Sequence, residues 1–152
     1  MKGREKMLKI YLDNCCYNRP FDDLSQERIH FESEAIYSIL MRVEKNQIKL
    51  FGSPLVEHEI DKNRDIHKKL KVLDLYQSIN EKIPVTVETK LRSKEIMSVS
   101  NISSYDSLHV AIAESAGVDI LLTTDDKFEK MANKIDLKVR VMNPLKFILE
   151  MM

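Results

Sequence analysis

The chain has 152 residues, of which 43% are hydrophobic and 32% are charged, which excludes a disordered chain and suits one domain, residues 1–152. Its 24 basic and 24 acidic residues cancel, and this argues against a protein that coats nucleic acid through a large cationic face. Apolar stretches are much shorter than a membrane span, and the basic start of the chain carries no apolar signal region. We therefore expect a cytoplasmic protein without membrane contact.

Strand-like and helix-like segments alternate along the chain. Apolar runs predict strands at 8–12, 48–53, 82–88, 118–124 and 137–143. Helical spacing of apolar residues predicts helices within 21–47, 53–63, 65–79, 89–100, 103–117, 125–135 and 144–152. This order is typical of an α/β fold, in which a mainly parallel sheet carries helices on both faces.

Punctuating residues indicate where several elements begin or end. Asp23 or Ser25 is expected to cap the helix within 21–47, and Ser53 is expected to cap the next helix. Gly117 marks the end of the helix that starts near residue 103. Pro84 cannot donate a ladder hydrogen bond, so the strand at 82–88 is expected at a sheet edge.

Acidic residues recur where the predicted strands end. Asp13 directly follows the first strand, and Asp125 and Asp126 follow the apolar run at 118–124. Asp106 lies in the first turn of a helix, and Glu59 lies in the helix after the second strand. Because parallel strands end at one edge of a sheet, we expect these carboxylates to face one patch.

Several carboxylates in one patch repel one another unless a cation neutralises them. Oxygen ligands without thiol or imidazole favour Mg²⁺ or Mn²⁺, and such ions ionise water and orient a phosphodiester. The pattern therefore predicts a metal-dependent nuclease, in which Asp13, Asp106 and Asp125 hold the metal while Glu59 binds a second ion or orients water. Taken singly, each acid also has an ordinary role as a turn, capping or solvated helix residue.

Three stretches resemble the PIN-domain nucleases, a family that includes VapC-type toxins: "KIYLDNC", "SPLVEHEI" and "SSYDSLHVAIAESAGVDILLTTDDKF". The resemblance spans about 8–147 and is most specific between Tyr105 and Phe128. It implies a three-layer α/β/α sandwich, an acidic site for Mg²⁺ or Mn²⁺, and RNA as the substrate of an endoribonuclease. The positions of the family's acidic residues are taken by Asp13, Glu59, Asp106 and Asp125.

The resemblance also implies supporting residues around these acids. Thr124 resembles the family's hydroxyl residue, Asn14 is a neutral hydrogen-bonding partner, and Asp126 is a further acid beside the site. Cys15 is a departure, because many members place serine or threonine there. This departure predicts weaker metal binding or weaker catalysis.

Two questions stay open at the level of sequence. Glu57 competes with Glu59 for the position of the site glutamate. The alternative to an enzyme is a catalytically degenerate PIN-like domain that binds RNA or a protein partner. A phosphotransferase of the haloacid-dehalogenase type needs a second aspartate where Cys15 stands, and it therefore ranks low.

Partners are inferred from the family and from apolar helix positions. Small toxins of this family are usually held inactive by an antitoxin protein, so an antitoxin is expected. The helix at 65–79 carries apolar residues that exceed the needs of one core, which predicts a homodimer; they are Leu70, Leu73, Tyr76 and Ile79.

The remaining aromatic and histidine residues receive structural interpretations. The spacing of five aromatic residues is typical of a core rather than of a platform for stacked bases; they are Tyr11, Phe31, Tyr37, Tyr76 and Phe147. His109 lies three residues after Asp106, on the same helical face. We expect a hydrogen-bonded, half-buried histidine there.

Overall fold

The computed structural model describes residues 7–152; residues 1–6, the basic start of the chain, lie outside the described residues. Across the described part, five strands form one sheet in the order β3-β2-β1-β4-β5, and all neighbouring pairs are parallel. The strands are β1 (Leu8–Leu12), β2 (Ile48–Gly52), β3 (Glu81–Lys82), β4 (Ile120–Leu122) and β5 (Arg140–Met142).

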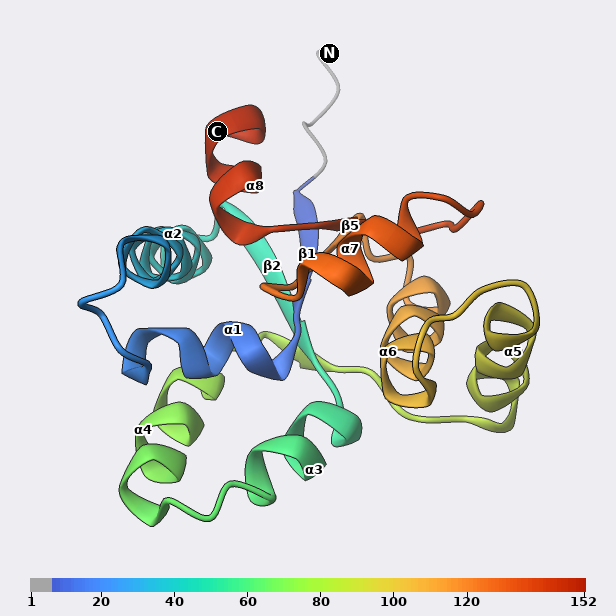
Figure 1. Ribbon diagram of the computed structural model, residues 1–152, viewed down its shortest axis with the longest axis horizontal. Helices are drawn as coiled ribbons and strands as arrows, with labels where there is room; N and C mark the ends of the chain where they lie inside the picture. Colours follow the sequence, from blue (N-terminus) through green and yellow to red (C-terminus); the bar gives the residue numbers. More distant parts are fainter. Residues whose placement is uncertain (1–6) are drawn as a thin grey trace.

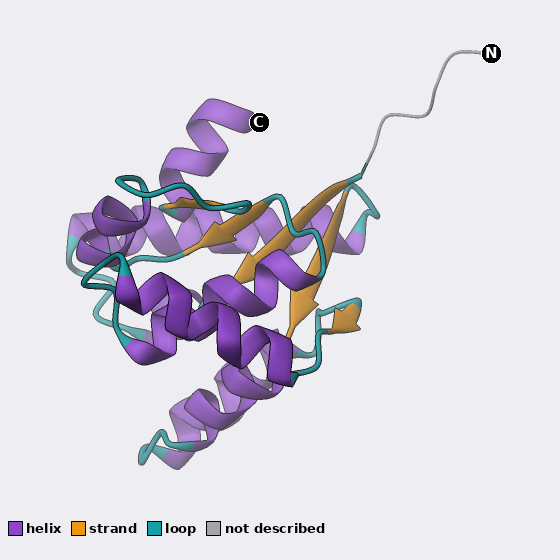
Figure 2. Cartoon of the chain, turned by 90° about the vertical axis from the view of Figure 1, so that its right-hand side faces the viewer, coloured by secondary structure: helices purple, strands orange, loops and turns teal. Residues whose placement is uncertain are grey.

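Helices cover both faces of this sheet, so the predicted three-layer α/β/α sandwich is confirmed. Figures 1 and 2 show α5 and α6 on one face and α2 and α8 on the other. The helices are α1 (Asn14–Asn18), the 3-10 helix η1 (Arg19–Phe21), α2 (Glu27–Glu44), α3 (Pro54–Asp61), α4 (Ile66–Tyr76), α5 (Val87–Ser98), α6 (Ser104–Ser115), α7 (Asp126–Ala132) and α8 (Pro144–Met151).

The central strands β1 and β4 are buried on both faces, as their continuous apolar sequences predict. Ile10, Leu12, Leu121 and Leu122 are fully buried between the two helical layers. The carboxyl ends of β1 and β2 are directed toward α3, and α6 lies to one side (Figure 1). Asp13 directly follows β1, and Ser53 directly follows β2 and caps α3.

None of the helices in residues 7–152 is both long and apolar enough to cross a bilayer.

The strand predicted at 82–88 is wrong over most of its length. Strand β3 has only two residues, and α5 already begins at Val87. Thr86 and Thr89 form a capping box, in which each hydroxyl accepts a hydrogen bond from the other residue's backbone N–H. This capping box, together with Pro84 and its missing N–H, favours the helix over a longer edge strand.

Two further differences concern the segment after β1. Residues 14–18 form helix α1, which the sequence pattern does not predict. The helix is stabilised by the burial of Cys16 and Tyr17 rather than by helix propensity. The Cys16 thiol donates to the Leu122 carbonyl at 3.3 Å, and the Tyr17 ring packs edge-on against Tyr76. Helix α2 begins at Glu27 without a side-chain cap, so the predicted caps near its start are wrong.

Other capping predictions are confirmed. Ser53 Oγ accepts a hydrogen bond from Val56 N–H at the start of α3, and Pro54 occupies the first turn. Gly117 follows α6 with φ of 67°, a left-handed conformation that favours glycine.

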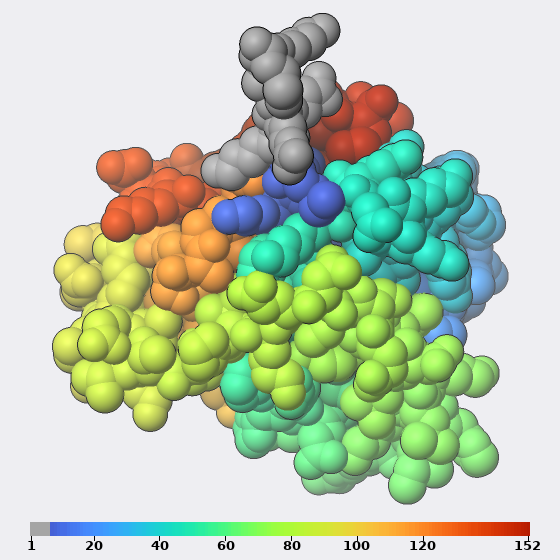
Figure 3. Space-filling view, turned by 180° about the vertical axis from the view of Figure 1, so that it is seen from behind, coloured from blue at the N-terminus to red at the C-terminus, as the bar shows by residue number. Residues whose placement is uncertain are grey.

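The surface holds several apolar side chains that the spacing argument places in the core. Phe31 and Tyr37 are 47% and 46% exposed on α2, whereas Tyr76 and Phe147 are buried as predicted. On α4, Leu70 is 60% exposed, as expected for an apolar residue beyond the needs of one core. Figure 3 shows from behind how the end of α2 lies beside the segment that follows α4.

Candidate acidic active site

Asp13 sits at the end of β1 and is held from two sides. Its backbone N–H donates to the Leu122 carbonyl at 3.0 Å, which extends the ladder between β1 and β4 by one residue. Thr123 Oγ1 donates to Asp13 Oδ2 at 3.0 Å. The carboxylate is therefore buried and fixed at the carboxyl edge of the sheet, as its position after the strand predicts.

Glu59 and His109 complete a tight cluster with Asp13. His109 Nε2 lies 2.5 Å from Glu59 Oε1 and 3.8 Å from Asp13 Oδ1. One potential ligand atom from each of the three residues lies within 4.8 Å of the others. Glu57 points elsewhere, to Tyr76 and the Lys82 ammonium, so Glu59 is the glutamate that faces Asp13.

Asp106 lies within electrostatic range of this cluster, in the first turn of α6. Burial, followed by the negative charge of Asp13, raises the pKa of Asp106 to about 6. The charge of Asp125 also raises this pKa, so the three aspartates interact. Burial lowers the pKa of His109, but the hydrogen bond with Glu59 and the charge of Asp13 outweigh this effect, so the pKa is raised. Asp106 and Asp125 are not members of the tight cluster of ligand atoms.

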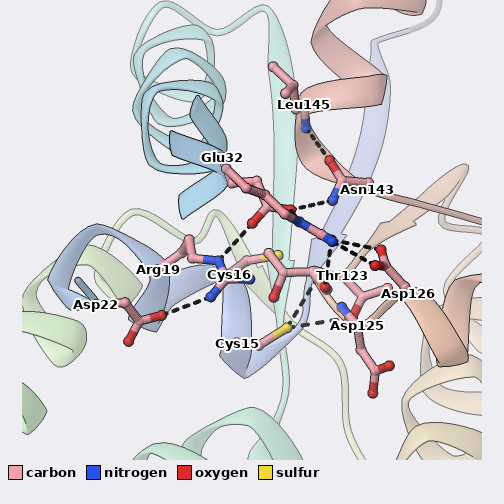
Figure 4. A network of polar contacts seen from close by, with 12 residues as sticks. Cys15, Cys16, Arg19, Asp22, Glu32, Thr123, Asp125, Asp126, Asn143 and Leu145 are labelled. Atoms are coloured by element: carbon pink, nitrogen blue, oxygen red, sulfur yellow. Dashed lines mark hydrogen bonds and ion pairs between the residues drawn. The ribbon is translucent and has the colours of Figure 1, made fainter. Parts of the chain in front are cut away.

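Asp125 is exposed and caps helix α7, where its Oδ1 accepts from the Phe128 N–H at 3.1 Å. The backbone N–H of Asp125 donates to Thr123 Oγ1 at 3.1 Å, so one hydroxyl joins the turn of Asp125 to the carboxylate of Asp13. Figure 4 shows the Asp125 carboxylate and the Asp126 carboxylate pointing in different directions.

The family resemblance suggests Thr124 as the hydroxyl residue that supports the site. In the structure, the hydroxyl beside Asp13 belongs to Thr123 instead. Alternate residues of an extended segment point to the same side, so Thr123 shares a side with Asp125. This alternation is a signal in the sequence that would have identified Thr123. Thr124 instead donates its backbone N–H to Cys15 Sγ at 3.4 Å.

Cys15 fills the space between these groups. Its Sγ lies 3.5 Å from Thr123 Oγ1 (Figure 4), and neither cysteine is in a disulfide. Burial raises the pKa of Asp13, as does the nearby Glu59 charge, while hydrogen bonds from Thr123 and Cys15 oppose this rise. The thiol therefore takes part in the polar surroundings of Asp13.

The two other predicted supporting residues lie outside the tight cluster. Asp126 forms a two-pronged ion pair with Arg28, with distances of 2.6 and 2.7 Å. Asn14 Oδ1 accepts from the Asn18 amide at 3.0 Å within α1. Asn14 nevertheless lines the same groove as Glu59.

This polar groove leads away from Glu59 between α1 and α3. Its volume is about 380 Å³, and it is lined by Asn14, Cys15, Asn18, Arg19, Asp22, Glu59, Lys62 and Asn63. At its rim, Lys62 Nζ donates to the Tyr105 hydroxyl at 2.9 Å, and Tyr105 is 38% exposed. An ammonium and an exposed aromatic ring thus stand beside the acidic residues.

A second cluster of charges lies behind the site, around Glu32 on α2 (Figure 4). The Glu32 carboxylate is 1% exposed. It accepts hydrogen bonds from Arg19 Nε at 2.8 Å, Arg28 Nε at 3.2 Å and Asn143 Nδ2 at 2.5 Å. We call these four residues the Glu32 cluster; it joins η1, α2 and the start of α8.

Comparison with known proteins places this geometry in a family. The sequence profile described as "PIN domain" matches residues 19–134, which include Glu59, Asp106 and Asp125. No curated protein matches the chain.

Two solved structures share the fold. The crystal structure of VapBC2 from Rickettsia felis bound to a promoter DNA fragment matches with a TM-score of 0.62 and 17% identity, covering 90% of this chain and 98% of the other. DNA-bound VapBC from Salmonella typhimurium matches with a TM-score of 0.59 and 14% identity, covering 91% and 99%. At these identities, the likeness establishes the fold. Because the profile spans more than half of the sequence, this chain belongs to the PIN domain family, a family of nucleases.

Proposed function

We propose that this protein is a metal-dependent endoribonuclease that hydrolyses RNA phosphodiester bonds with Mg²⁺ or Mn²⁺. The observation that carries the proposal is the close approach of Asp13 and Glu59, from β1 and α3, at the edge of the sheet. Asp106 lies within electrostatic range of Asp13 and Asp125. We call the site formed by Asp13, Glu59, Asp106 and His109 the acidic pocket. Membership of the PIN domain family supports a hydrolytic role.

The donor set suits a hard divalent cation. The carboxylates of Asp13 and Glu59 lie beside a single imidazole, and Asp106 lies within electrostatic range, so negative charge is in excess. Carboxylate oxygens of this kind favour Mg²⁺ or Mn²⁺ over softer metals. Asp13, Asp106 and Asp125 would hold the ion, which when bound lowers the pKa of water and stabilises charge on the phosphate.

Other residues of the chain would orient the metal ligands and the attacking water. Thr123 fixes the orientation of the Asp13 carboxylate through its 3.0 Å hydrogen bond. Glu59 would orient the attacking water or bind a second ion. These carboxylates are placed by a strand end and by helices, which are rigid parts of the fold, so the site is arranged before substrate arrives.

The rim of the pocket offers contacts for a single-stranded nucleic acid. Lys62 supplies an ammonium for a phosphate, and the exposed ring of Tyr105 supplies a surface on which a base stacks. The amides of Asn18 and Asn63 line the adjoining groove. A local grip of this kind is compatible with a net charge of zero.

A cleavage assay tests the proposal. We expect the protein to cut a labelled single-stranded RNA in the presence of Mn²⁺ and to stop on addition of EDTA. The Asp13→Asn variant should neither cut RNA nor bind Mn²⁺ in a calorimetric titration. Uncut RNA with no binding of Mn²⁺ by the wild-type protein would refute the proposal.

The alternative is a catalytically degenerate PIN-like domain that binds RNA or a protein. The specific observation in its favour is Cys15, which lies beside Asp13 where many members place a hydroxyl residue. Binding of RNA with no cleavage at any Mn²⁺ concentration would favour this alternative over the enzyme.

We further propose that an antitoxin protein inhibits the nuclease, as in a toxin–antitoxin pair. We also propose that the protein is cytoplasmic. Support comes from the likeness to the VapBC structures of Rickettsia felis and Salmonella typhimurium, together with the resemblance to VapC-type toxins. Co-expression with the gene product encoded beside this protein should give a stable complex that no longer cuts RNA. Failure to form any such complex would contradict an antitoxin partner.

A homodimer is proposed as well, although the structure changes its basis. Of the four residues that predict the dimer, Leu73, Tyr76 and Ile79 pack in or against the chain's own core, and Leu70 is exposed. The exposed Phe31 and Tyr37 on α2 add apolar surface. Light scattering should give twice the chain mass of 17.8 kDa, and particles of 17.8 kDa alone would contradict the dimer.

A further inference from the structure

A chain of hydrogen bonds connects the start of α3 with the acidic pocket. Val56 N–H lies 3.2 Å from Ser53 Oγ, which in turn lies 2.7 Å from the Tyr11 hydroxyl oxygen. That oxygen lies 2.6 Å from His109 Nδ1, and His109 Nε2 lies 2.5 Å from Glu59 Oε1. Ser53, Tyr11 and His109 are fully buried, so bulk water does not reach their hydrogen-bonding atoms.

The backbone end of this chain fixes the direction of donation. Val56 N–H can only donate, so Ser53 Oγ accepts there. Within residues 7–152, the contacts of Ser53 Oγ are this N–H and the Tyr11 oxygen. The hydroxyl hydrogen of Ser53 therefore has one acceptor, the Tyr11 oxygen, because a buried donor without a partner is costly. Tyr11 must then donate its own hydrogen to His109 Nδ1.

We infer that His109 is held as the neutral tautomer that carries its proton on Nε2, and that it is a positioning residue that donates to Glu59 rather than a metal ligand. An Nδ1 atom that accepts from Tyr11 has no proton of its own. The proton of a neutral imidazole is then on Nε2, which faces Glu59. A doubly protonated ring would turn Nδ1 into a donor to the Tyr11 oxygen. The hydroxyl hydrogen of either Tyr11 or Ser53 would then have no acceptor.

This assignment changes how the tight cluster is understood. Asp13, Glu59 and His109 together have the spacing of a mixed nitrogen–oxygen metal site. A protonated Nε2 has no lone pair for a metal, so carboxylate oxygens alone remain as ligands. The relay through Tyr11 and Ser53 thus selects a hard cation and fixes one oxygen of Glu59. The role of Glu59 rests on the proposed function, whereas the tautomer does not.

Nuclear magnetic resonance of the metal-free protein tests the tautomer directly. Histidine labelled with ¹⁵N is observed at pH 8, because the neighbouring carboxylates raise the pKa of His109, and its signal is the one lost in His109→Gln. The expected ring has an unprotonated Nδ1 and a protonated Nε2, and the Tyr11→Phe variant should lose this preference. A proton on Nδ1 in the wild-type ring, alone or in addition to Nε2, would overturn the inference. The exposed histidines are internal references: His30, His58 and His67.

Two matched variants test the positioning role. The side-chain amide introduced by His109→Gln reaches the place of Nε2, so this variant should keep Mn²⁺ affinity within about 3-fold of wild type. The shorter amide introduced by His109→Asn falls short of Glu59. With Glu59 as the ligand of a second ion, affinity for that ion should drop about 10- to 100-fold, as for other groups that orient metal ligands. Equal affinities of the two variants would contradict the role. Both variants are compared after circular dichroism confirms that they are folded.

A spectroscopic measurement separates donor from ligand. Electron paramagnetic resonance of the Mn²⁺-loaded protein should show no coupling to a histidine nitrogen. Such a coupling, lost in His109→Gln, would overturn the inference. The tautomer is measured without metal or RNA, so its outcome is independent of the proposed function. A protein with the expected tautomer that neither binds Mn²⁺ nor cuts RNA would refute the proposed ribonuclease and leave the inference about His109 intact.

Discussion

Two clusters of charge contact the turn at residues 123–126, and they differ in how well their charges are matched. Arg28 of the Glu32 cluster contacts the Thr124 carbonyl and Asp126, whereas Thr123 binds Asp13 of the acidic pocket. In the Glu32 cluster, one carboxylate is matched by Arg19, Arg28 and the Asn143 amide, all within 3.2 Å of it. In the acidic pocket, Asp13 and Glu59 both lie beside the His109 imidazole, and Asp106 is nearby. Within residues 7–152, no arginine or lysine lies within ion-pair distance of these three acids.

The difference distinguishes a structural from a functional use of charge. A matched ion cluster satisfies its own members and joins helices, and its loss is felt as instability. An unmatched group of carboxylates costs stability, and chains tolerate it where an external cation or substrate completes it. Changes in the Glu32 cluster should therefore affect folding, whereas changes in the acidic pocket should affect metal binding and catalysis.

The largest effect is expected on stability, from Glu32→Gln. This variant leaves the guanidinium groups of Arg19 and Arg28 beside a neutral amide. The free energy of unfolding should fall by about 3 kcal/mol, as for other buried ion pairs that lose one partner. Urea denaturation measures this loss. The control Asp126→Asn removes an exposed partner of Arg28 and should cost about 1 kcal/mol or less. A similar cost for both variants would remove the distinction between the clusters.

The second effect concerns Asp106→Asn in the acidic pocket. RNA cleavage should fall at least about 100-fold, because the variant loses a charge that faces the reacting groups. The melting temperature without metal should stay the same or rise, since repulsion from Asp13 disappears. The increase in melting temperature caused by Mn²⁺ should shrink.

The exposed Asp74 of α4 offers a matched control, because Asp74→Asn changes the net charge equally but lies on another helix. It should leave cleavage unchanged. A large loss of stability in Asp106→Asn without metal would show that this carboxylate, like Glu32, serves the fold.

A gain is expected from Cys15→Ser, which introduces the kind of residue that many family members have there. A serine hydroxyl makes a shorter and stronger hydrogen bond than a thiol, so it should hold Asp13 more firmly. Affinity for Mn²⁺ should rise by up to about 10-fold, and cleavage should rise with it.

The neighbouring thiol gives the control for that change. Cys16 is fully buried and donates to the Leu122 carbonyl, so Cys16→Ser should bring no gain in Mn²⁺ affinity. If Cys15→Ser leaves Mn²⁺ affinity and cleavage unchanged, the thiol already supports Asp13 as well as a hydroxyl does.

The smallest effect is expected at the rim, from Lys62→Ala. The KM for single-stranded RNA should rise about 3-fold at unchanged kcat, because a phosphate contact is lost while the acids remain. The slope of log KM against log salt should decrease by about 0.7. Lys69→Ala, which removes a lysine paired with Asp61, should leave both values unchanged. A fall in kcat would place Lys62 among the reacting groups instead.

Local patterns in the sequence were sufficient for the layers of the fold and for much of the pocket. Continuous apolar runs and helical spacing depend on neighbouring residues, so they indicate β1, β2, α3 and α6 directly. The carboxyl ends of parallel strands share an edge, and this is why Asp13 could be assigned to the edge that α3 and α6 also approach.

Only the tertiary structure decided which side chains meet at that edge. Glu57 and Glu59 lie in the same charged stretch, and the packing of α3 turns Glu59 toward His109 while Glu57 pairs with Lys82. The relay from Ser53 to His109 joins residues that are 42 and 98 positions from Tyr11. Helix α1 likewise depends on burial against β4 and α4. Spacing along the chain indicates an element and its faces, but the direction of a side chain toward a partner depends on how distant elements pack.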